Sequence, residues 1–211
     1  MPRPKRVQDA GYVQHVVCRG NDRQLLFNSS SDFEQYIKLL NEARGLFPVY
    51  IYNFVLMDNH IHLLVEPKSD GNLAKMMEMV SKAYAKYFNK TYNREGNVFQ
   101  GRYKSFLIQE ERYFFACSHY IDFNPVQATL VADPKDYHWS GYNALATGKE
   151  GELYLDEHHI YHDLGTTDQE RKISYRALVH NYQGEELNLL ERRAGILGDR
   201  DFKKRFMKNN G

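Results

Sequence analysis

The chain has 211 residues, of which 42% are hydrophobic and 26% charged, and its formal net charge is +1. These values are typical of a globular protein with one sizeable domain and an appendage, or with two small domains. No apolar stretch approaches the roughly 20 residues of a membrane span, and the basic start lacks the apolar core of a signal peptide. The two cysteines, Cys18 and Cys117, argue against a disulfide scaffold, so we expect a cytoplasmic protein without a membrane partner.

The first half of the chain predicts a strand, a helix, a hairpin and a second helix. Residues 11–19 alternate and end at a Gly-Asn-Asp turn, and a helix with a cap at Ser31-Asp32 should run to Pro48. Residues 49–57 and 60–65 are β-prone and predict a hairpin joined by Asp58-Asn59. The Met-rich stripe of a helix over 72–88 is assigned to the core.

The second half is less regular. We expect a strand over 98–109, then a helix from 110 to about 123 that Asn124-Pro125 ends. Residues 147–151 predict a linker, so we divide the chain into a domain over 1–150 and a mostly helical extension over 151–211. The histidines of this extension have no partner motif and are assigned to the surface: His158, His159 and His162. The whole pattern favours an α+β fold, an antiparallel sheet with helices packed on it.

Two histidines two residues apart begin the second strand of the predicted hairpin. In a strand, His60 and His62 point to the same face, while Ile61 points to the opposite one. Two imidazoles on one face can share a divalent metal ion. Alternatively, they face solvent or form hydrogen bonds without any ligand, and a bare His-x-His motif leaves both interpretations open.

The predicted helix over 110–123 carries a candidate nucleophile. Tyr120 and Asn124 are four residues apart and share a helix face. A phenol is a poor nucleophile at neutral pH unless a metal or a base lies beside it, and a metal held by two histidines and an amide oxygen would polarise a phosphate. Because the chain has sixteen tyrosines, Tyr120 also fits a packing role, and Asn124 also fits a helix cap or pre-proline turn.

Several basic residues indicate contacts with DNA. Arg102 and Lys104 alternate with Tyr103, and single-strand binding uses cations for phosphates and rings for base stacking. Alternatively, Tyr103 faces the core. Arg19 and Arg23 bracket the first turn and are candidates for phosphate contacts, and the basic tail 200–206 fits either a DNA-contacting helix or a solvated helix end.

Three separately placed motifs together resemble the IS200-like single-tyrosine transposases, and within them the REP-associated tyrosine transposases. The motifs are Met-Asp-Asn-His-Ile-His-Leu-Leu-Val at 57–65, Gly-Arg-Tyr-Lys-Ser at 101–105 and Tyr-Ile-Asp-Phe-Asn-Pro-Val at 120–126. Segments 16–21 and 139–142 add to the resemblance, which extends over about residues 10–145. Asp58 and Gln127 depart from it, since relatives commonly carry proline and arginine there. The second departure removes a positive charge near the site.

This resemblance implies a ferredoxin-like, RRM-like antiparallel sheet and a metal-dependent endonuclease and strand-transferase that acts on single-stranded or hairpin DNA. It implies that His60 and His62 bind Mg²⁺ or Mn²⁺, with Asn124 at the position of the third ligand. Tyr120 matches the nucleophile that attacks a DNA phosphate, giving a 5′-phosphotyrosine and a free 3′-hydroxyl. Related proteins act as homodimers or monomers, so both states stay open.

Two other classes of function remain open at this stage. One is a descendant that binds DNA hairpins without turnover. The other is an RRM-like RNA-binding module, although its usual aromatic platform signature is absent here.

Overall fold

The computed structural model describes residues 10–183 and 195–209. Its first six helices and strands follow the order β-α-β-β-α-β: β1 (Gln14–Arg19), α1 (Ser30–Leu46), β2 (Val49–Met57), β3 (His60–Pro67), α2 (Asn72–Thr91) and β4 (Lys104–Ile108). In the described residues a fifth strand, β5 (Gly195–Leu197), completes one sheet with the order β2-β3-β1-β4-β5. All pairs are antiparallel except β4 with β5. The order of the first four strands is the ferredoxin-like arrangement, so the predicted fold class is confirmed.

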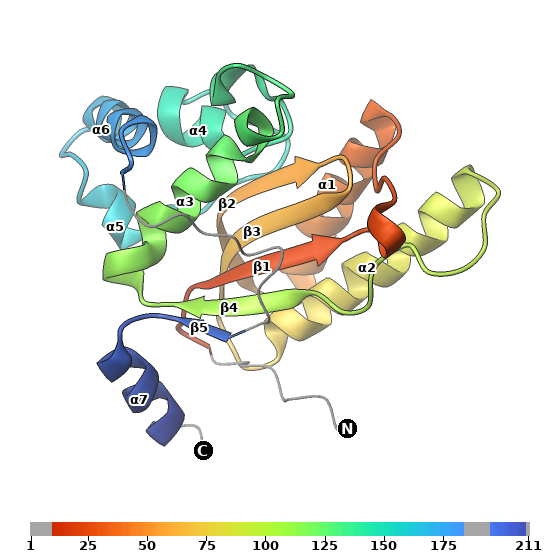
Figure 1. Ribbon diagram of the computed structural model, residues 1–211, viewed down its shortest axis with the longest axis horizontal. Helices are drawn as coiled ribbons and strands as arrows, with labels where there is room; N and C mark the ends of the chain where they lie inside the picture. The colour runs from red at the N-terminus through yellow and green to blue at the C-terminus, as the bar shows by residue number, and fades with distance from the viewer. Residues whose placement is uncertain (1–9, 184–194, 210–211) are drawn as a thin grey trace.

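Helices cover both faces of the sheet (Figure 1). On one face, α1 and α2 bury an apolar layer against the strands, to which Ile61, Leu63 and Val65 of β3 contribute. On the other face lies α3 (Glu110–Gln127), packed on a second layer that includes Leu64 of the same strand. Because successive strand residues alternate between faces, β3 supplies both layers.

Local sequence signals explain the two helices of the first layer. A capping box begins α1, slightly before the predicted cap. In it, the side chains of Ser29 and Asp32 each form a hydrogen bond with the other residue's backbone. Leu46, at the end of this helix, is exposed rather than part of its apolar stripe. The predicted stripe of α2 is buried as expected, from Leu73 to Phe88.

The region around α3 differs from the prediction at both ends. Residues 98–103 do not form a regular strand: a single bridge joins Phe99 to Gly20, and β4 starts only at Lys104. Pro125 does not end α3, which continues to Gln127. A proline removes one helical hydrogen bond, and here Pro125 is buried while the amide of Leu130 bonds its carbonyl. Tertiary packing therefore outweighs the local preference to stop.

The described C-terminal part packs onto this sheet and combines helices with one strand. It contains α4 (Tyr142–Thr147), α5 (His159–His162), α6 (Asp168–His180) and α7 (Arg200–Asn209) besides β5. Residues 152–156 are bound to α1 and β2, because Asn41 and Arg44 donate to their carbonyls and the amide of Asp156 bonds Ile51.

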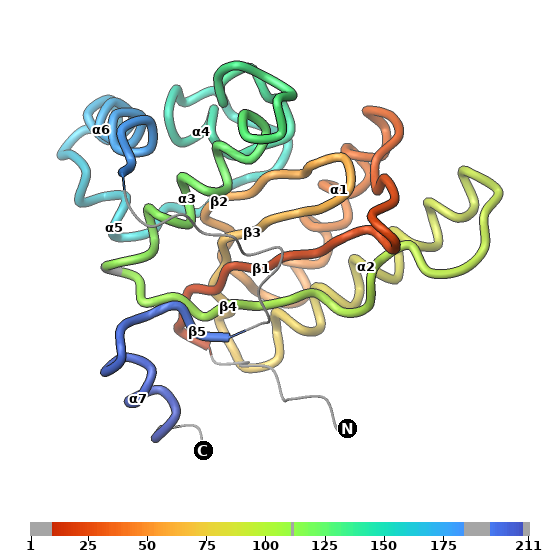
Figure 2. The backbone as a smooth tube through the Cα atoms, viewed as in Figure 1, coloured from red at the N-terminus to blue at the C-terminus, as the bar shows by residue number. Residues whose placement is uncertain are grey.

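Where it is described, the extension over 151–211, predicted to be mostly helical, contains α5, α6 and α7, but it also includes the strand β5. Residues 184–194 lie outside the described part. In Figure 2, α6 lies near α3 and α4, whereas β5 lies beside β4 at the edge of the sheet. Among the described residues, no helix is both long and apolar enough to cross a membrane.

Candidate active site

The histidine pair on β3 meets the asparagine of α3. His60 Nε2 lies 3.1 Å from Asn124 Oδ1, although the two residues are 64 positions apart. Neither residue is solvent-facing, since His60 is 9% and Asn124 7% exposed. Asn124 lies inside α3 rather than at its cap, and its Nδ2 donates to the Tyr120 carbonyl at 2.9 Å. This bond fixes the amide so that its oxygen faces His60.

His60 lies between two hydrogen-bond acceptors. Its Nδ1 is 2.7 Å from Asn59 Oδ1, and the amide of Asn59 is oriented by donation to the Arg23 carbonyl at 3.4 Å. Burial lowers the pKa of His60, and the nearby Arg19 cation lowers it further, against an opposing effect of Asn124. A neutral imidazole has one N–H and can satisfy one acceptor. The second contact therefore places a ring-nitrogen lone pair against a carbonyl oxygen unless a cation lies between them.

His62 is fully buried and bonded to a third histidine. Its Nδ1 is 2.9 Å from Nε2 of His15, which comes from β1. Within the described part of the chain, His62 Nε2 and His15 Nδ1 are buried without a hydrogen-bond partner. Burial lowers the pKa of both rings, that of His15 to about 3, and the two neighbouring histidines lower the pKa of His62 further. Both imidazoles are therefore neutral at pH 7.

The tyrosine of α3 packs directly on these rings. The ring of Tyr120 is edge-on to His62, with centroids 5.2 Å apart, and 5.7 Å from His15. Tyr120 is 8% exposed and also contributes to the apolar layer under α3. The packing interpretation and the site interpretation of Tyr120 are thus compatible, because the same ring does both.

These residues fit a small divalent cation. Two neighbouring ligands of an octahedral Mg²⁺, each about 2.1 Å away, are about 3 Å apart, which is close to the 3.1 Å between His60 Nε2 and Asn124 Oδ1. The unpartnered His62 Nε2 offers another lone pair. An amide oxygen suits Mg²⁺ or Mn²⁺, whereas imidazole nitrogens are more typical ligands of transition metals such as Zn²⁺ or Fe²⁺, so this donor set by itself does not select one divalent ion.

The predicted DNA-contacting residues fall into two groups. Arg19 and Lys104 share the sheet face of the histidines: Arg19 pairs with His60, and Lys104 pairs with Val17, itself opposite His62. Arg19 Nε is buried and has no partner in the described residues.

The other three residues lie outside the regular strands. Arg23 is exposed at the end of a short 3-10 helix (Asn21–Arg23), Arg102 is exposed in the bend before β4, and Tyr103 packs against the layer under α1 and α2. The core interpretation of Tyr103 is therefore favoured by its contacts.

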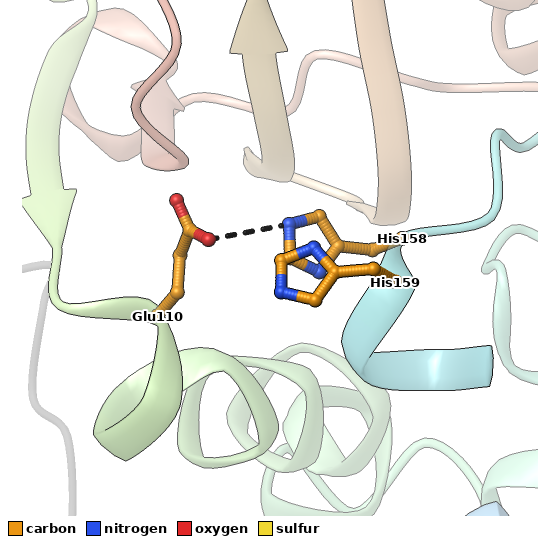
Figure 3. Close-up of side chains that lie close together, drawn as sticks. All are labelled: Glu110, His158 and His159. Carbon is orange, nitrogen blue, oxygen red and sulfur yellow. Dashed lines mark ion pairs between the residues drawn. The ribbon is translucent and has the colours of Figure 1, made fainter. Parts of the chain in front are cut away.

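A second cluster of possible ligands lies away from this site. Glu110, at the start of α3, approaches His158 and His159 at the start of α5, with one ligand atom of each within 4.8 Å of the others (Figure 3). The surface assignment of His158 is wrong: it is 5% exposed, stacks on Phe114 and lies edge-on to Tyr52.

Contacts within the protein account for the orientation of His158 in this cluster. His158 Nδ1 accepts the Ile160 amide at 3.3 Å, which leaves Nε2 to carry the proton toward Glu110 Oε2 at 3.5 Å. Glu110 is ten residues from Tyr120 on α3, about 15 Å at the helical rise. The cluster is therefore separate from the site around His60.

His15 and Asn59 were not predicted as site residues from the sequence. Each supplies a partner for Nδ1 of one histidine of the pair. His15 could have been recognised from the sequence because it is a polar residue between Val13 and Val17, on the inward face of an otherwise apolar strand. Asn59 precedes His60 directly, in a turn whose side-chain bonds cannot be inferred from spacing.

Comparison with known proteins identifies the family. The family described as "Transposase IS200 like" matches residues 10–124, more than half of the chain. A protein of Haemophilus influenzae whose name assigns it to the REP-associated tyrosine transposases is 24% identical over 142 residues, which are 63% of this chain and 79% of that protein. A solved structure of a REP-associated tyrosine transposase bound to a REP hairpin has a TM-score of 0.56 at 16% identity, over 74% of this chain and 93% of that one. The resemblance carried by the three motifs is thereby confirmed, and the chain belongs to the IS200-like transposases.

Proposed function

We propose that this protein is a metal-dependent endonuclease and strand-transferase that cleaves single-stranded DNA beside a hairpin through a tyrosine nucleophile. The observation that carries the proposal is the convergence of His60, His62 and Asn124 with Tyr120 in one buried cluster. Two elements far apart in sequence supply these residues. Potential metal ligands next to a phenol are an arrangement that suits phosphate transesterification, and one of these ligand atoms, His62 Nε2, is buried without a hydrogen-bond partner among the described residues.

The proposed reaction exchanges one phosphoester bond for another. The Tyr120 oxygen attacks a DNA phosphorus, forming a Tyr–O–P bond while the bond from phosphorus to the 3′-oxygen breaks. The phenol loses one proton and the leaving oxygen gains one, so the products are a 5′-phosphotyrosine and a free 3′-hydroxyl. Mg²⁺ or Mn²⁺, when bound by His60, His62 and Asn124, supplies Lewis acidity that polarises the phosphate.

The charged residues on the same sheet face would orient the DNA backbone. Arg19 is beside His60 in the strand register, and its guanidinium group is the type of donor that binds phosphate oxygens. Lys104 is two strands from His62, about 10 Å at the usual strand spacing, a distance that fits a neighbouring phosphate. Arg23, Arg102 and Tyr103 lie at the periphery and are proposed to contact flanking nucleotides.

Hairpin DNA is proposed as the substrate because of the structural neighbour. That protein was solved with a REP hairpin, and its fold covers 74% of the present chain. An RRM-like RNA-binding function is disfavoured by the architecture. RRM modules bind RNA on the open face of a four-stranded sheet, whereas α3 covers the corresponding face here (Figure 1).

The decisive experiment is covalent capture with a labelled hairpin that carries a single-stranded flank. Wild type with Mn²⁺ should give an adduct that resists denaturing electrophoresis, and chelation should abolish it. Tyr120→Phe should give no adduct while it binds the hairpin as tightly as wild type. Tyr137→Phe is the matched control, because Tyr137 is equally buried but its hydroxyl donates to the Leu56 carbonyl.

Each other outcome selects a different function. Tight hairpin binding without an adduct under any metal condition would indicate a binding protein that has lost turnover. Preference for RNA of the same sequence would indicate an RNA-binding module. The oligomeric state, monomer or homodimer, stays open and is measured by light scattering of the free protein and of its DNA complex.

A further inference from the structure

His15 lies next to the proposed metal site without belonging to it. It is fully buried on β1, and its Nε2 is 2.9 Å from Nδ1 of His62 on the adjacent strand. The two rings meet edge-on, with centroids 5.1 Å apart and an interplanar angle of 74°. His15 therefore has a directed contact with His62 through one specific ring nitrogen.

The proton between the two rings has two arrangements. Either His62 Nδ1 donates to His15 Nε2, or His15 Nε2 donates to His62 Nδ1. Each arrangement leaves one N–H and one lone pair without a protein partner, on His62 Nε2 and His15 Nδ1. Hydrogen-bond counting within the protein thus does not favour one of them.

Metal coordination removes this ambiguity. A neutral imidazole binds a metal through the nitrogen that lacks a proton, and its other N–H commonly donates to a nearby acceptor that fixes the ring. If His62 Nε2 is the ligand, Nδ1 carries the proton, and His15 Nε2 is the acceptor within reach.

The neighbouring histidine is held in the same way. His60 Nδ1 is 2.7 Å from the oxygen of Asn59, and its Nε2 faces Asn124. Both histidines of the pair therefore have an acceptor at Nδ1, one an amide oxygen and the other an imidazole nitrogen. This shared pattern leaves Nε2 as the nitrogen that faces the site on each ring.

We propose that His15 is a positioning residue: its Nε2 accepts the His62 Nδ1 proton and so keeps the His62 Nε2 lone pair available to the metal ion. The inference rests on the proposed function, since it concerns the same metal site. It adds a third histidine whose effect passes through His62 and which touches neither metal nor DNA.

The test compares three variants for Mn²⁺ affinity by calorimetry in the absence of DNA. His15→Leu removes the acceptor and should weaken Mn²⁺ binding about 10- to 100-fold, the usual effect of losing such a partner. His15→Gln places an amide oxygen near the position of Nε2 and should stay close to wild type. Val13→Ala, on the same strand face and equally buried, is the packing control and should also bind as wild type.

A spectroscopic readout separates positioning from packing. In ¹⁵N spectra of the Mg²⁺-loaded wild type, His15 should be protonated at Nδ1 and unprotonated at Nε2. The proposal would be overturned by any of three results. These are a proton on His15 Nε2, wild-type Mn²⁺ affinity in His15→Leu, or equal losses of Mn²⁺ affinity in His15→Gln and His15→Leu. If wild type binds Mn²⁺ no better than His62→Ala, the metal site itself is wrong and both proposals fall. If wild type binds Mn²⁺ as expected but gives no DNA adduct, only the proposed function fails.

Discussion

Each of the three proposed ligands uses one polar atom to hold its side chain and leaves another facing the site. His60 and His62 are held through Nδ1, by Asn59 and His15. Asn124 is held through Nδ2 by the Tyr120 carbonyl. The remaining atoms are two imidazole nitrogens and one amide oxygen, which are all acceptors when each histidine of the pair carries its proton on Nδ1. Such a set is costly when buried and becomes favourable around a cation.

The two clusters of potential ligands should respond differently to substitution. His62→Ala should lower Mn²⁺ affinity at least tenfold, because it removes a proposed ligand, whereas His159→Ala should leave it unchanged. The measurement is a calorimetric titration of each variant. Equal losses in both variants, or a loss only in His159→Ala, would assign the metal to the cluster at Glu110 instead.

Asn124 should matter less than either histidine. In Asn124→Ala a water molecule can replace the lost oxygen, so we expect the rate of adduct formation to fall by a smaller factor than in His60→Ala. Single-turnover rates at saturating Mn²⁺ measure both. An unchanged rate and unchanged Mn²⁺ dependence in Asn124→Ala would remove this residue from the site.

At the scale of elements, α3 is the helix that brings the site together. Its contacts through Asp122 fix it to two other elements: Asn53 of β2 donates to one carboxylate oxygen at 2.9 Å, and Tyr175 of α6 donates to the other at 2.6 Å. The three side chains are fully or almost fully buried. This network tethers the middle of α3 beside the residues that face the histidines.

This network predicts a pH dependence of stability. Burial raises the pKa of Asp122 to about 7, although the bonds from Tyr175 and Asn53 oppose the effect. In the unfolded chain the pKa is about 4. Between these values the folded state holds a proton that the unfolded state lacks, so the contribution of Asp122 to the free energy of unfolding decreases as pH rises from about 4 to about 7.

Asp122→Asn should remove that contribution, whereas Asp136→Asn, at an exposed carboxylate, should keep it. Urea unfolding at several pH values measures the slope. An identical slope in wild type and Asp122→Asn would show that this carboxyl does not titrate in the range.

The turn after β1 is a second element on which the site depends. A Cβ atom on Gly20 would lie 2.2 Å from the Gln24 carbonyl oxygen, so this backbone requires glycine. The same turn carries the Arg23 carbonyl that orients Asn59.

Gly20→Ala should lower the thermal midpoint and reduce adduct formation, because the turn must rearrange. Gly45→Ala is the matched control: it lies in α1 with open space around it, so it should leave activity unchanged and stabilise by about 0.5–1 kcal/mol. Wild-type stability in Gly20→Ala would contradict the role of this turn.

At the scale of the whole molecule, the sheet separates two surfaces with different tasks. The face toward α1 and α2 is an apolar layer, and the face toward α3 carries the histidines with Arg19 and Lys104. The near-neutral net charge gives no general attraction for DNA. Binding should therefore depend on where the cations lie.

The salt dependence of hairpin binding tests this arrangement. If Lys104 contacts a phosphate, Lys104→Ala should weaken binding and reduce the slope of log affinity against log salt by about 0.7–0.9. Lys82→Ala should change neither, because Lys82 is exposed on α2, the helix on the opposite face. Equal effects of the two substitutions would indicate diffuse electrostatic binding.

The sequence by itself determined the features that depend on neighbouring residues. Alternation predicted the β2–β3 hairpin and placed His60 and His62 on one face, and helical periodicity predicted the buried stripe of α2. The motifs in the order 57–65, 101–105 and 120–126 identified the family. Each of these follows from local backbone geometry or from short motifs, which a single sequence carries directly.

Only the tertiary structure decided which distant residues meet. The pairing of β1 with β3 brings His15 to His62, and the packing of α3 on the sheet brings Asn124 to His60. The same packing carries α3 through Pro125 and buries His158, both against the local expectation. The physical reason is that strand register and the burial of apolar surface are long-range terms, and they outweigh local preferences of about 1–3 kcal/mol.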